Sequence, residues 1–360
     1  MRTPLLHAGP GRVDALTQIV NSLAVFFLGD PDNLQPPEAP TSYPFLWLTP
    51  RLLWVQWSPI TSNPIARNAG EVLGVFGDAS FGSDPTQPRF SSSVTFQNLY
   101  ELEQWIDSLQ PLRWREDLLG PIDEARWKRG AWLFRKDCRG CHNMPPFDMT
   151  PKEENIAQKQ FIKITRVPYR TVGTDPLYVQ SLNDSFAETD HLAPLLFDGR
   201  PIVPAVEFLQ KTVATTVAKG LDDLGLTPAQ KLAYSDYRFR PLASPGSRPE
   251  SYAPPSTTDL KAGPLLGIWA TGPFLHNGSV ANVYELLSPP RERSRVFWVG
   301  RRELDVAKLG LVSTEGPDLF LFDTTLPGNR NSGHAFPPQP YTAEQRWQVI
   351  EYLKDPQRFS

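Results

Sequence analysis

Residues 121–142 read PIDEARWKRGAWLFRKDCRGCH, and this stretch decides the fold that the sequence predicts. Its last five residues, CRGCH at 138–142, have the spacing at which c-type haem is attached, with two thiols bonding the porphyrin and the adjacent imidazole binding the iron. Cys138 and Cys141 are the only cysteines among the 360 residues. The sequence therefore predicts one covalently bound haem c, attached through Cys138 and Cys141, with His142 as the proximal ligand of the iron.

Two other interpretations of this motif stay open. A zinc site needs four ligands, usually Cys or His, and the chain has no second cysteine pair. A thioredoxin-like redox pair places C-x-x-C at the start of a helix within a βαβ unit, whereas here a predicted helix precedes the motif. Both patterns fit the sequence less well than haem attachment does.

Helices are predicted on both sides of the motif. Residues 121–137 open with proline and acidic residues and close with basic ones, which is the charge order that suits the helix dipole. Gly130, Phe134 and Cys138 lie four residues apart and therefore share one face of this helix. Near the end of the chain, T-x-x-Q at 342–345 forms a capping box before an apolar helical stripe. The spacing alone shows two amphipathic helices, and their arrangement resembles a c-type cytochrome domain, in which the first and last helices cross near the haem.

Two more helices are predicted between these landmarks or before them. One covers 96–109 and the other 209–224, because apolar residues recur there at helical spacing. The stretch 241–258 is rich in proline and serine and is expected to be a solvent loop. The apolar stripe expected in the first of these helices consists of Leu99, Leu102, Ile106 and Leu109.

The composition limits the class of protein. With 36 basic and 39 acidic residues the net charge is −3, and this balance does not indicate a nucleic-acid partner. No apolar run reaches the roughly 20 residues of a membrane-spanning helix, so no transmembrane segment is expected. The 24 glycines and 38 prolines predict long ordered loops in a mainly α protein. Five arginines between 291 and 302 are expected to form a solvated face, with contact to a haem propionate or an acidic redox partner as the alternative.

The second axial ligand has few candidates. Met144 and Met149 follow His142 by two and seven residues, which is too close to reach the opposite face of a haem. His334 lies in a polar loop just before the closing helix, so it ranks first. His276 precedes a turn signal and is expected to line the haem pocket. Ligation by His276, or an open position for oxygen or peroxide, stays an alternative.

Four blocks of sequence carry a resemblance to a known family. They are CRGCH at 138–142, RTVGTDP at 170–176, GPLLGIWATGPFLHNGSVANVYELL at 263–287 and GNRNSGHAF at 328–336. In this order they resemble the bacterial di-haem cytochrome c peroxidase superfamily, most closely its rubber-oxygenase-like branch. The likeness covers nearly the whole chain.

The resemblance implies roles for individual residues. In that branch the C-terminal haem is an electron relay held by two histidines, which gives His142 as the proximal and His334 as the distal ligand. The related peroxidases place the histidine of the TGPFLHNG block near the haem edge, which suits His276. An aromatic residue between the haems assists electron passage, a role that Trp54 or Trp57 could hold, with simple core packing as the alternative.

The resemblance also implies that a part is missing. Relatives carry a second C-x-x-C-H upstream, and this sequence contains none. We therefore expect 1–115 to be the remnant of a first, cytochrome-like haem domain plus the segment between the haems. We expect 116–360 to be the C-terminal cytochrome c domain, with long loops and a large insertion. A truncated or mis-started reading frame explains this pattern, and a natural mono-haem relative is the alternative.

The predicted function is electron transfer by a c-type haem, alone or as part of a di-haem oxidoreductase of the peroxidase or oxygenase type. A mono-haem enzyme that reduces peroxide or activates oxygen at an open distal site is one alternative. A truncated, non-functional fragment without haem is the other. Because haem c is attached outside the bacterial inner membrane, the resemblance implies a periplasmic protein with a possible redox partner protein, although the first residues contain no signal peptide. Whether the chain is itself an enzyme, and on which substrate, is left open.

Overall fold

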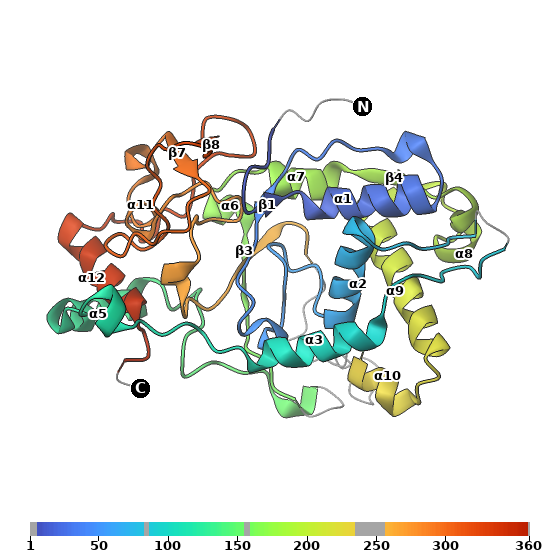
Figure 1. Cartoon of the computed structure of the whole chain (residues 1–360), viewed down its shortest axis with the longest axis horizontal. Coiled ribbons are helices and arrows are strands. Elements are labelled where there is room, and N and C mark those ends of the chain that lie inside the picture. Colours follow the sequence, from blue (N-terminus) through green and yellow to red (C-terminus); the bar gives the residue numbers. More distant parts are fainter. Residues whose placement is uncertain (1–5, 83–85, 155–158, 235–255, 359–360) are drawn as a thin grey trace.

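The structure of the chain, a computed structural model, describes residues 6–82, 86–154, 159–234 and 256–358 (Figure 1). The loop predicted over 241–258 lies largely outside these described residues. Twelve α-helices and eight short strands occur within them. None of these helices is long and apolar enough to cross a membrane.

Helices dominate the described part of the chain, and small sheets join its long loops. The helices are α1 (Ala15–Asn21), α2 (Pro64–Val75), α3 (Phe96–Ser108), α4 (Glu116–Leu119), α5 (Glu124–Asp137), α6 (Tyr169–Val172), α7 (Leu177–Asp184), α8 (Ala193–Leu196), α9 (Ala205–Asp223), α10 (Pro228–Tyr234), α11 (Val283–Leu286) and α12 (Ala343–Lys354). The strands form four antiparallel pairs: β1 (Arg12–Val13) with β2 (Thr41–Ser42), β3 (Thr165–Pro168) with β6 (Asp259–Ala262), β4 (Phe186–Glu188) with β5 (Ile202–Pro204), and β7 (Val296–Val299) with β8 (Phe320–Asp323).

The expectation of a mainly α fold is only partly confirmed, because the small sheets make the fold mixed. Pairs such as β3 with β6 join segments about 90 residues apart in the sequence, with Thr165 opposite Ala262. Buried backbone N–H and C=O groups need hydrogen-bond partners, and long loops that cross the interior find them by pairing as short strands. Hydrophobic periodicity alone does not reveal such pairs.

The predicted helices are present, and their bounds differ by one to four residues from the predicted ones. The helix predicted over 121–137 begins at Glu124, because the Asp123 side chain accepts a hydrogen bond from the Arg126 N–H and caps it. The capping box that opens α12 is confirmed, with reciprocal bonds between Thr342 and Gln345. Helix α9 starts four residues before the predicted 209.

The predicted stripe of α3 is wrong in part. Leu102 and Leu109 are exposed, together with Trp105, while Glu103 is buried. The Glu103 carboxylate accepts a hydrogen bond of 2.7 Å from the Arg67 guanidinium, and this buried ion pair occupies the inward side of the helix.

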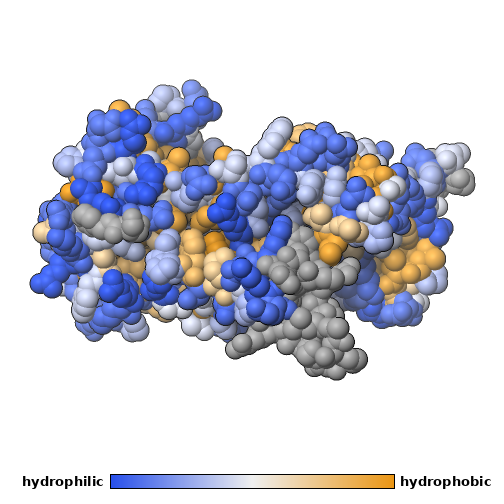
Figure 2. Space-filling view, turned by 90° about the horizontal axis from the view of Figure 1, so that it is seen from below, coloured by the Kyte–Doolittle hydropathy of each residue, from blue (hydrophilic) through white to orange (hydrophobic). Residues whose placement is uncertain are grey.

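Apolar residues interrupt a largely hydrophilic surface in the space-filling view from below (Figure 2).

Two large hydrophobic cores lie side by side. One surrounds α5 and α12 and includes the loop before α11. The other joins α1, α2 and α3 with α9, which belongs to the insertion expected between the C-x-x-C-H motif and the closing helix. Both cores contain residues from each side of residue 115, so a domain boundary there stays a prediction.

Helices α5 and α12 cross at Gly130, and this contact closes the first core (Figure 1). A Cβ at Gly130 would lie 1.8 Å from the Gln348 carbonyl oxygen, so only glycine permits this approach. The ring of Tyr352, on α12, lies 5.0 Å from that of Phe134, on α5. The Trp127 indole also donates a 2.9 Å hydrogen bond to the Asp355 carbonyl, just beyond α12.

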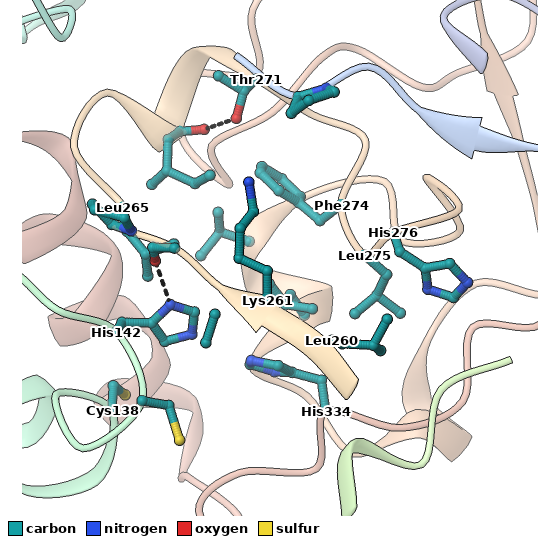
Figure 3. Close-up of a pocket in the computed structure, with 18 of the residues that line it drawn as sticks. Cys138, His142, Leu260, Lys261, Leu265, Thr271, Phe274, Leu275, His276 and His334 are labelled. Atoms are coloured by element: carbon teal, nitrogen blue, oxygen red, sulfur yellow. Dashed lines mark hydrogen bonds between the residues drawn. The ribbon is translucent and has the colours of Figure 1, made fainter. Parts of the chain in front are cut away.

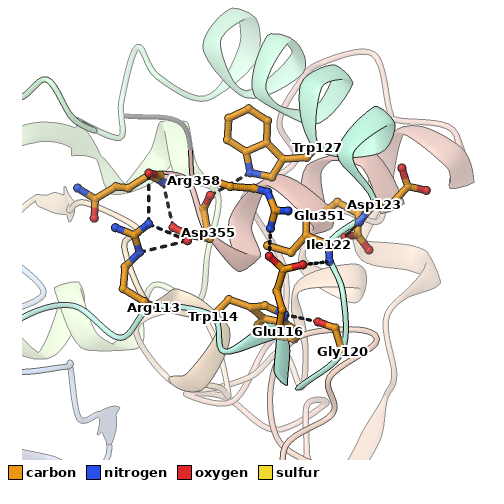
Figure 4. A network of polar contacts seen from close by, with 11 residues as sticks. Arg113, Trp114, Glu116, Gly120, Ile122, Asp123, Trp127, Glu351, Asp355 and Arg358 are labelled. Carbon is orange, nitrogen blue, oxygen red and sulfur yellow. Dashed lines mark hydrogen bonds and ion pairs between the residues drawn. The ribbon is translucent and has the colours of Figure 1, made fainter. Parts of the chain in front are cut away.

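A polar network ties the end of α12 to the segment before α5 (Figure 4). The Arg113 guanidinium donates to the Asp355 carboxylate at 2.9 Å, and Arg358 pairs with Glu116. Glu116 also accepts a hydrogen bond from the Ile122 N–H at 3.1 Å. The crossing that supports the C-x-x-C-H turn is therefore fixed by packing inside and by ion pairs outside.

We predict that Gly130→Ala lowers the free energy of unfolding by about 1–3 kcal/mol or more, because overpacking pushes α12 away from α5. Urea unfolding measures this change. Gly70→Ala is the matched control, since a Cβ in that helix meets its nearest atom at 3.7 Å and alanine is the better helix former. Equal unfolding midpoints for Gly130→Ala and wild type would contradict the prediction.

Candidate functional site

An apolar cavity of about 270 Å³ lies between the C-terminal end of α5, strand β6 and the loop before α12 (Figure 3). Leucine, phenylalanine, valine and proline form most of its walls. Such a space is suited to a flat apolar group that is fixed by a few polar contacts.

The structure places most of the predicted site residues around this cavity. Those that line it are Cys138, Cys141, His142, His276, His334 and Trp57. Trp54 does not line it, because its side chain is buried in the first core with 2% exposure. The indole N–H of Trp57 donates a 2.8 Å hydrogen bond to the Ser42 carbonyl, which fixes its ring beside the cavity.

The C-x-x-C-H motif forms a turn at the end of α5. The Cys138 N–H closes the helix on the Phe134 carbonyl at 2.9 Å, and the N–H groups of Cys141 and His142 both donate to the Cys138 carbonyl. His142 Nδ1 lies 2.8 Å from the Gly263 carbonyl oxygen. Because a carbonyl only accepts, Nδ1 carries the proton and Nε2 keeps a free lone pair. This tautomer is the one that binds a metal through Nε2.

The ring of His334 faces that of His142 across the cavity (Figure 3). The two ring centroids are 6.2 Å apart. Two imidazoles that bind one metal atom from opposite sides, each through a bond of about 2 Å, have centroids about 6 Å apart. His334 Nδ1 is buried and has no hydrogen-bond partner among the described residues. The donor set therefore fits an iron between the two rings.

The electrostatics of the cavity keep both imidazoles neutral. Burial lowers the pKa of His142, and the hydrogen bond to Gly263 opposes this shift. Burial lowers the pKa of His334 to about 3, with smaller contributions from His142 and Arg293. A neutral imidazole offers its lone pair to a metal, whereas a protonated one does not.

The loop that carries His334 has little conformational freedom. Gly333 has φ +79° and His334 has φ +49°, both in the left-handed region. A Cβ at Gly333 would lie 2.3 Å from the Thr174 backbone nitrogen. The His334 N–H donates a 2.7 Å hydrogen bond to the Val172 carbonyl. The RTVGTDP block therefore holds the loop from one side.

Arg293 holds the same loop from the other side. Arg293 is 4% exposed, and its guanidinium donates to the carbonyls of Asn331 at 2.5 Å and Gly333 at 2.9 Å. Burial lowers the pKa of Arg293 to about 10. Arg291 and Arg295 are exposed, as expected for a solvated face, so the basic cluster contains one internal member.

The two cysteines are suited to covalent attachment rather than to thiolate chemistry. Both are free and half-buried, and burial raises the pKa of Cys138 to about 11. Low-pKa thiolates are typical of redox pairs and metal ligands. Among residues 6–82, 86–154, 159–234 and 256–358, no three His, Cys, Asp or Glu side chains are arranged to bind one metal ion. The Met144 sulfur accepts a hydrogen bond from the Leu265 N–H at 3.2 Å and does not line the cavity.

His276 borders the cavity from within the protein, with 4% exposure. Its Nδ1 lies 3.4 Å from the Thr174 hydroxyl, and its ring centroid lies 5.6 Å from that of Tyr178. Burial, and to a smaller extent the charge of Arg12, lowers its pKa to about 3. Its contact with a cofactor stays a prediction.

Comparison with known proteins agrees with a cytochrome. Residues 260–298 match the protein family described as RoxA-like, cytochrome c-like. The matched segment contains most of β6, the Gly263 carbonyl that fixes His142, and His276. It indicates a cytochrome c-like domain, with the haem-binding and electron-transfer or oxidoreductase-like role that such a domain implies, and supports the resemblance to rubber-oxygenase-like cytochromes c.

Two curated proteins of Sinorhizobium fredii (strain NBRC 101917 / NGR234) are similar to the chain. The uncharacterized protein y4iJ is 34% identical over 376 residues, which cover 97% of this chain and 60% of that protein. The uncharacterized protein y4iM is 25% identical over 317 residues, which cover 84% of this chain and 60% of that protein. The chain thus spans about 60% of the length of each relative.

Sequence reasoning missed two polar residues at the site. Arg293 was assigned only to a basic cluster, and its interior position follows from tertiary contacts that no local pattern encodes. Lys261 was not considered, although it stands alone between Leu260 and Ala262, directly before the GPLLG block. Strand β6 carries two charged residues, Asp259 and Lys261, and a lysine flanked by Leu260 and Ala262 is the signal that could have identified it.

We predict that Arg293→Met loosens the His334 loop by about 1–3 kcal/mol, because several buried carbonyls lose their donor. Hydrogen exchange of the backbone amides at 328–336 measures this local opening. Arg295→Met removes the same charge from the exposed neighbour and should leave exchange unchanged. Wild-type protection of this loop in Arg293→Met would refute the assignment.

His276 makes stability depend on pH. Its folded-state pKa lies below the unfolded value, so its contribution is fully present above about pH 6.5 and is lost as the pH falls toward 3. The loss is about 1.4 kcal/mol per pH unit for this one group. We expect urea unfolding at pH 6.5, 5.5 and 4.5 to show a shallower decline for His276→Gln than for wild type. Parallel declines would show that His276 is not buried in its neutral form.

Proposed function

We propose that the chain is an electron-transfer cytochrome with one haem c, attached through Cys138 and Cys141 and ligated by His142 and His334. The observation that carries this proposal is the pair of neutral imidazoles, 6.2 Å apart, beside two free cysteines in an apolar cavity. The match of residues 260–298 to a cytochrome c-like family supports it independently.

When bound, a haem supplies a one-electron couple between ferric and ferrous iron. The protein contributes position and environment. The Gly263 carbonyl holds His142 in the ligating tautomer, and the Val172 carbonyl anchors the backbone of His334. The mostly apolar walls make the surroundings of the site weakly polar, and pocket polarity is one of the factors that set the reactivity of a haem. His142 and His334 would both hold the iron, so the bound group would have no position left for a small oxidant.

We further propose that the chain works within a di-haem oxidoreductase of the rubber-oxygenase-like branch, in which this haem relays electrons. The greater length of both relatives is compatible with additional parts. Trp57, which borders the cavity, is the better candidate of the two tryptophans for an aromatic contact along the electron path. The proposed location is the periplasm, where haem c is attached, and the proposed partner is a redox protein.

The test is to produce the chain with an export signal and a cytochrome c maturation system. We expect an intact mass that includes one haem and a visible spectrum of six-coordinate, low-spin iron that peroxide does not change. His334→Ala should give a high-spin spectrum and bind cyanide at least tenfold more tightly, because it opens one axial position. Cys138→Ala with Cys141→Ala should abolish covalent haem.

The matched control is His191→Ala, because His191 lies outside the cavity and its Nε2 is 3.0 Å from the Phe81 carbonyl oxygen. This variant should keep the wild-type spectrum. Colourless wild-type protein with the bare polypeptide mass would refute the proposal. A high-spin wild-type haem that reacts with peroxide would instead support a mono-haem enzyme.

A further inference from the structure

Lys261 extends from β6 into the cavity (Figure 3). Within the described residues, no carboxylate or carbonyl oxygen accepts a hydrogen bond from its ammonium group, and its backbone N–H donates to the Trp57 carbonyl at 2.8 Å. Burial lowers the pKa of Lys261 to about 8, with a smaller effect from the like charge of Arg67. The side chain is therefore largely protonated at neutral pH.

An unpaired ammonium in an apolar cavity is costly. Lys261 is half-buried, and taking part of its charge out of water costs free energy unless an opposite charge compensates it. Apart from the histidines, two residues that line the cavity have formally charged side chains, Lys261 and Asp137. Asp137 accepts a 2.9 Å hydrogen bond from the Tyr341 hydroxyl and lies 3.6 Å from Lys136, so it is already engaged at the end of α5. The cavity thus offers one positive charge, that of Lys261, for which the described part of the chain provides no ion-pair partner.

The position of this charge fits the polarity of a haem. In the close-up, Cys138 lies beyond His142 at one end of the cavity, whereas the Lys261 side chain extends toward Thr271 and Phe274 at the other (Figure 3). The vinyl groups that react with the thiols and the two propionates lie at opposite edges of a porphyrin. A haem attached at Cys138 therefore directs its carboxylates toward the end of the cavity that holds Lys261.

We propose that Lys261 binds a propionate carboxylate of the haem inside the cavity and thereby raises the reduction potential of the iron. This inference rests on the proposed function. A positive charge beside the cofactor favours the ferrous state, because reduction adds one negative charge to the cofactor. The pairing also explains why a lone lysine is tolerated in an otherwise apolar wall.

The test is a spectroelectrochemical titration of the haem-loaded protein. Lys261→Met removes the charge at similar volume and should shift the reduction equilibrium at least tenfold toward ferric iron, which is about 59 mV for one electron. Lys261→Arg keeps the positive charge, so its reduction potential should lie close to that of the wild type. Lys308→Met removes an equal charge from the exposed surface and should titrate like wild type.

Lys261→Gln keeps a hydrogen-bond donor and serves if the methionine variant assembles poorly. A potential equal to wild type in the methionine or glutamine variant, with full haem content, would overturn the role of Lys261 and leave the proposed function standing. Wild-type protein without covalent haem would overturn both. A shift as large in Lys308→Met as in Lys261→Met would also overturn the inference, because it would reflect net charge alone.

Discussion

The separation between the rings of His142 and His334 is the constraint on which the site depends. A distance of 6.2 Å between the ring centroids of two half-buried, neutral imidazoles is too long for a hydrogen bond between them and suits one metal atom bound by both. The chain maintains this gap from both sides, through the Gly263 carbonyl on His142 and through the loop that ends at His334. The His142 ring cannot turn without losing its hydrogen bond to Gly263, and the His334 backbone cannot move without losing its hydrogen bond to Val172.

Other contacts in the fold hold the two segments that carry these histidines in place. Gly130 lets α12 approach α5 closely, which fixes the turn that carries Cys138 and His142. On the other side, Arg293 binds the carbonyls around His334 and holds a loop that contains no regular secondary structure. Long Gly- and Pro-rich loops are usually mobile, and here buried arginine and glycine contacts make one of them rigid enough to position a ligand.

Much of the helical structure around the site could be predicted from local sequence. The helices beside the motif follow from capping residues and apolar spacing, and the C-x-x-C-H turn follows from its own residues. The strands could not be predicted, because pairs such as β3 with β6 depend on contacts between distant segments. For the same reason, the sequence did not predict that Lys261 lines the cavity or that Arg293 points into the interior. For Trp54 and Trp57, three residues apart, only the tertiary fold decides which one meets the cavity.

The central claim is that two imidazoles bind the iron. Near-infrared magnetic circular dichroism of the ferric, haem-loaded protein tests it most directly, because the energy of the charge-transfer band depends on the pair of axial ligands. The account predicts the band of bis-histidine ligation, lost in a variant without the His334 imidazole. A band typical of histidine with methionine, or of histidine with water, in the wild-type protein would contradict it.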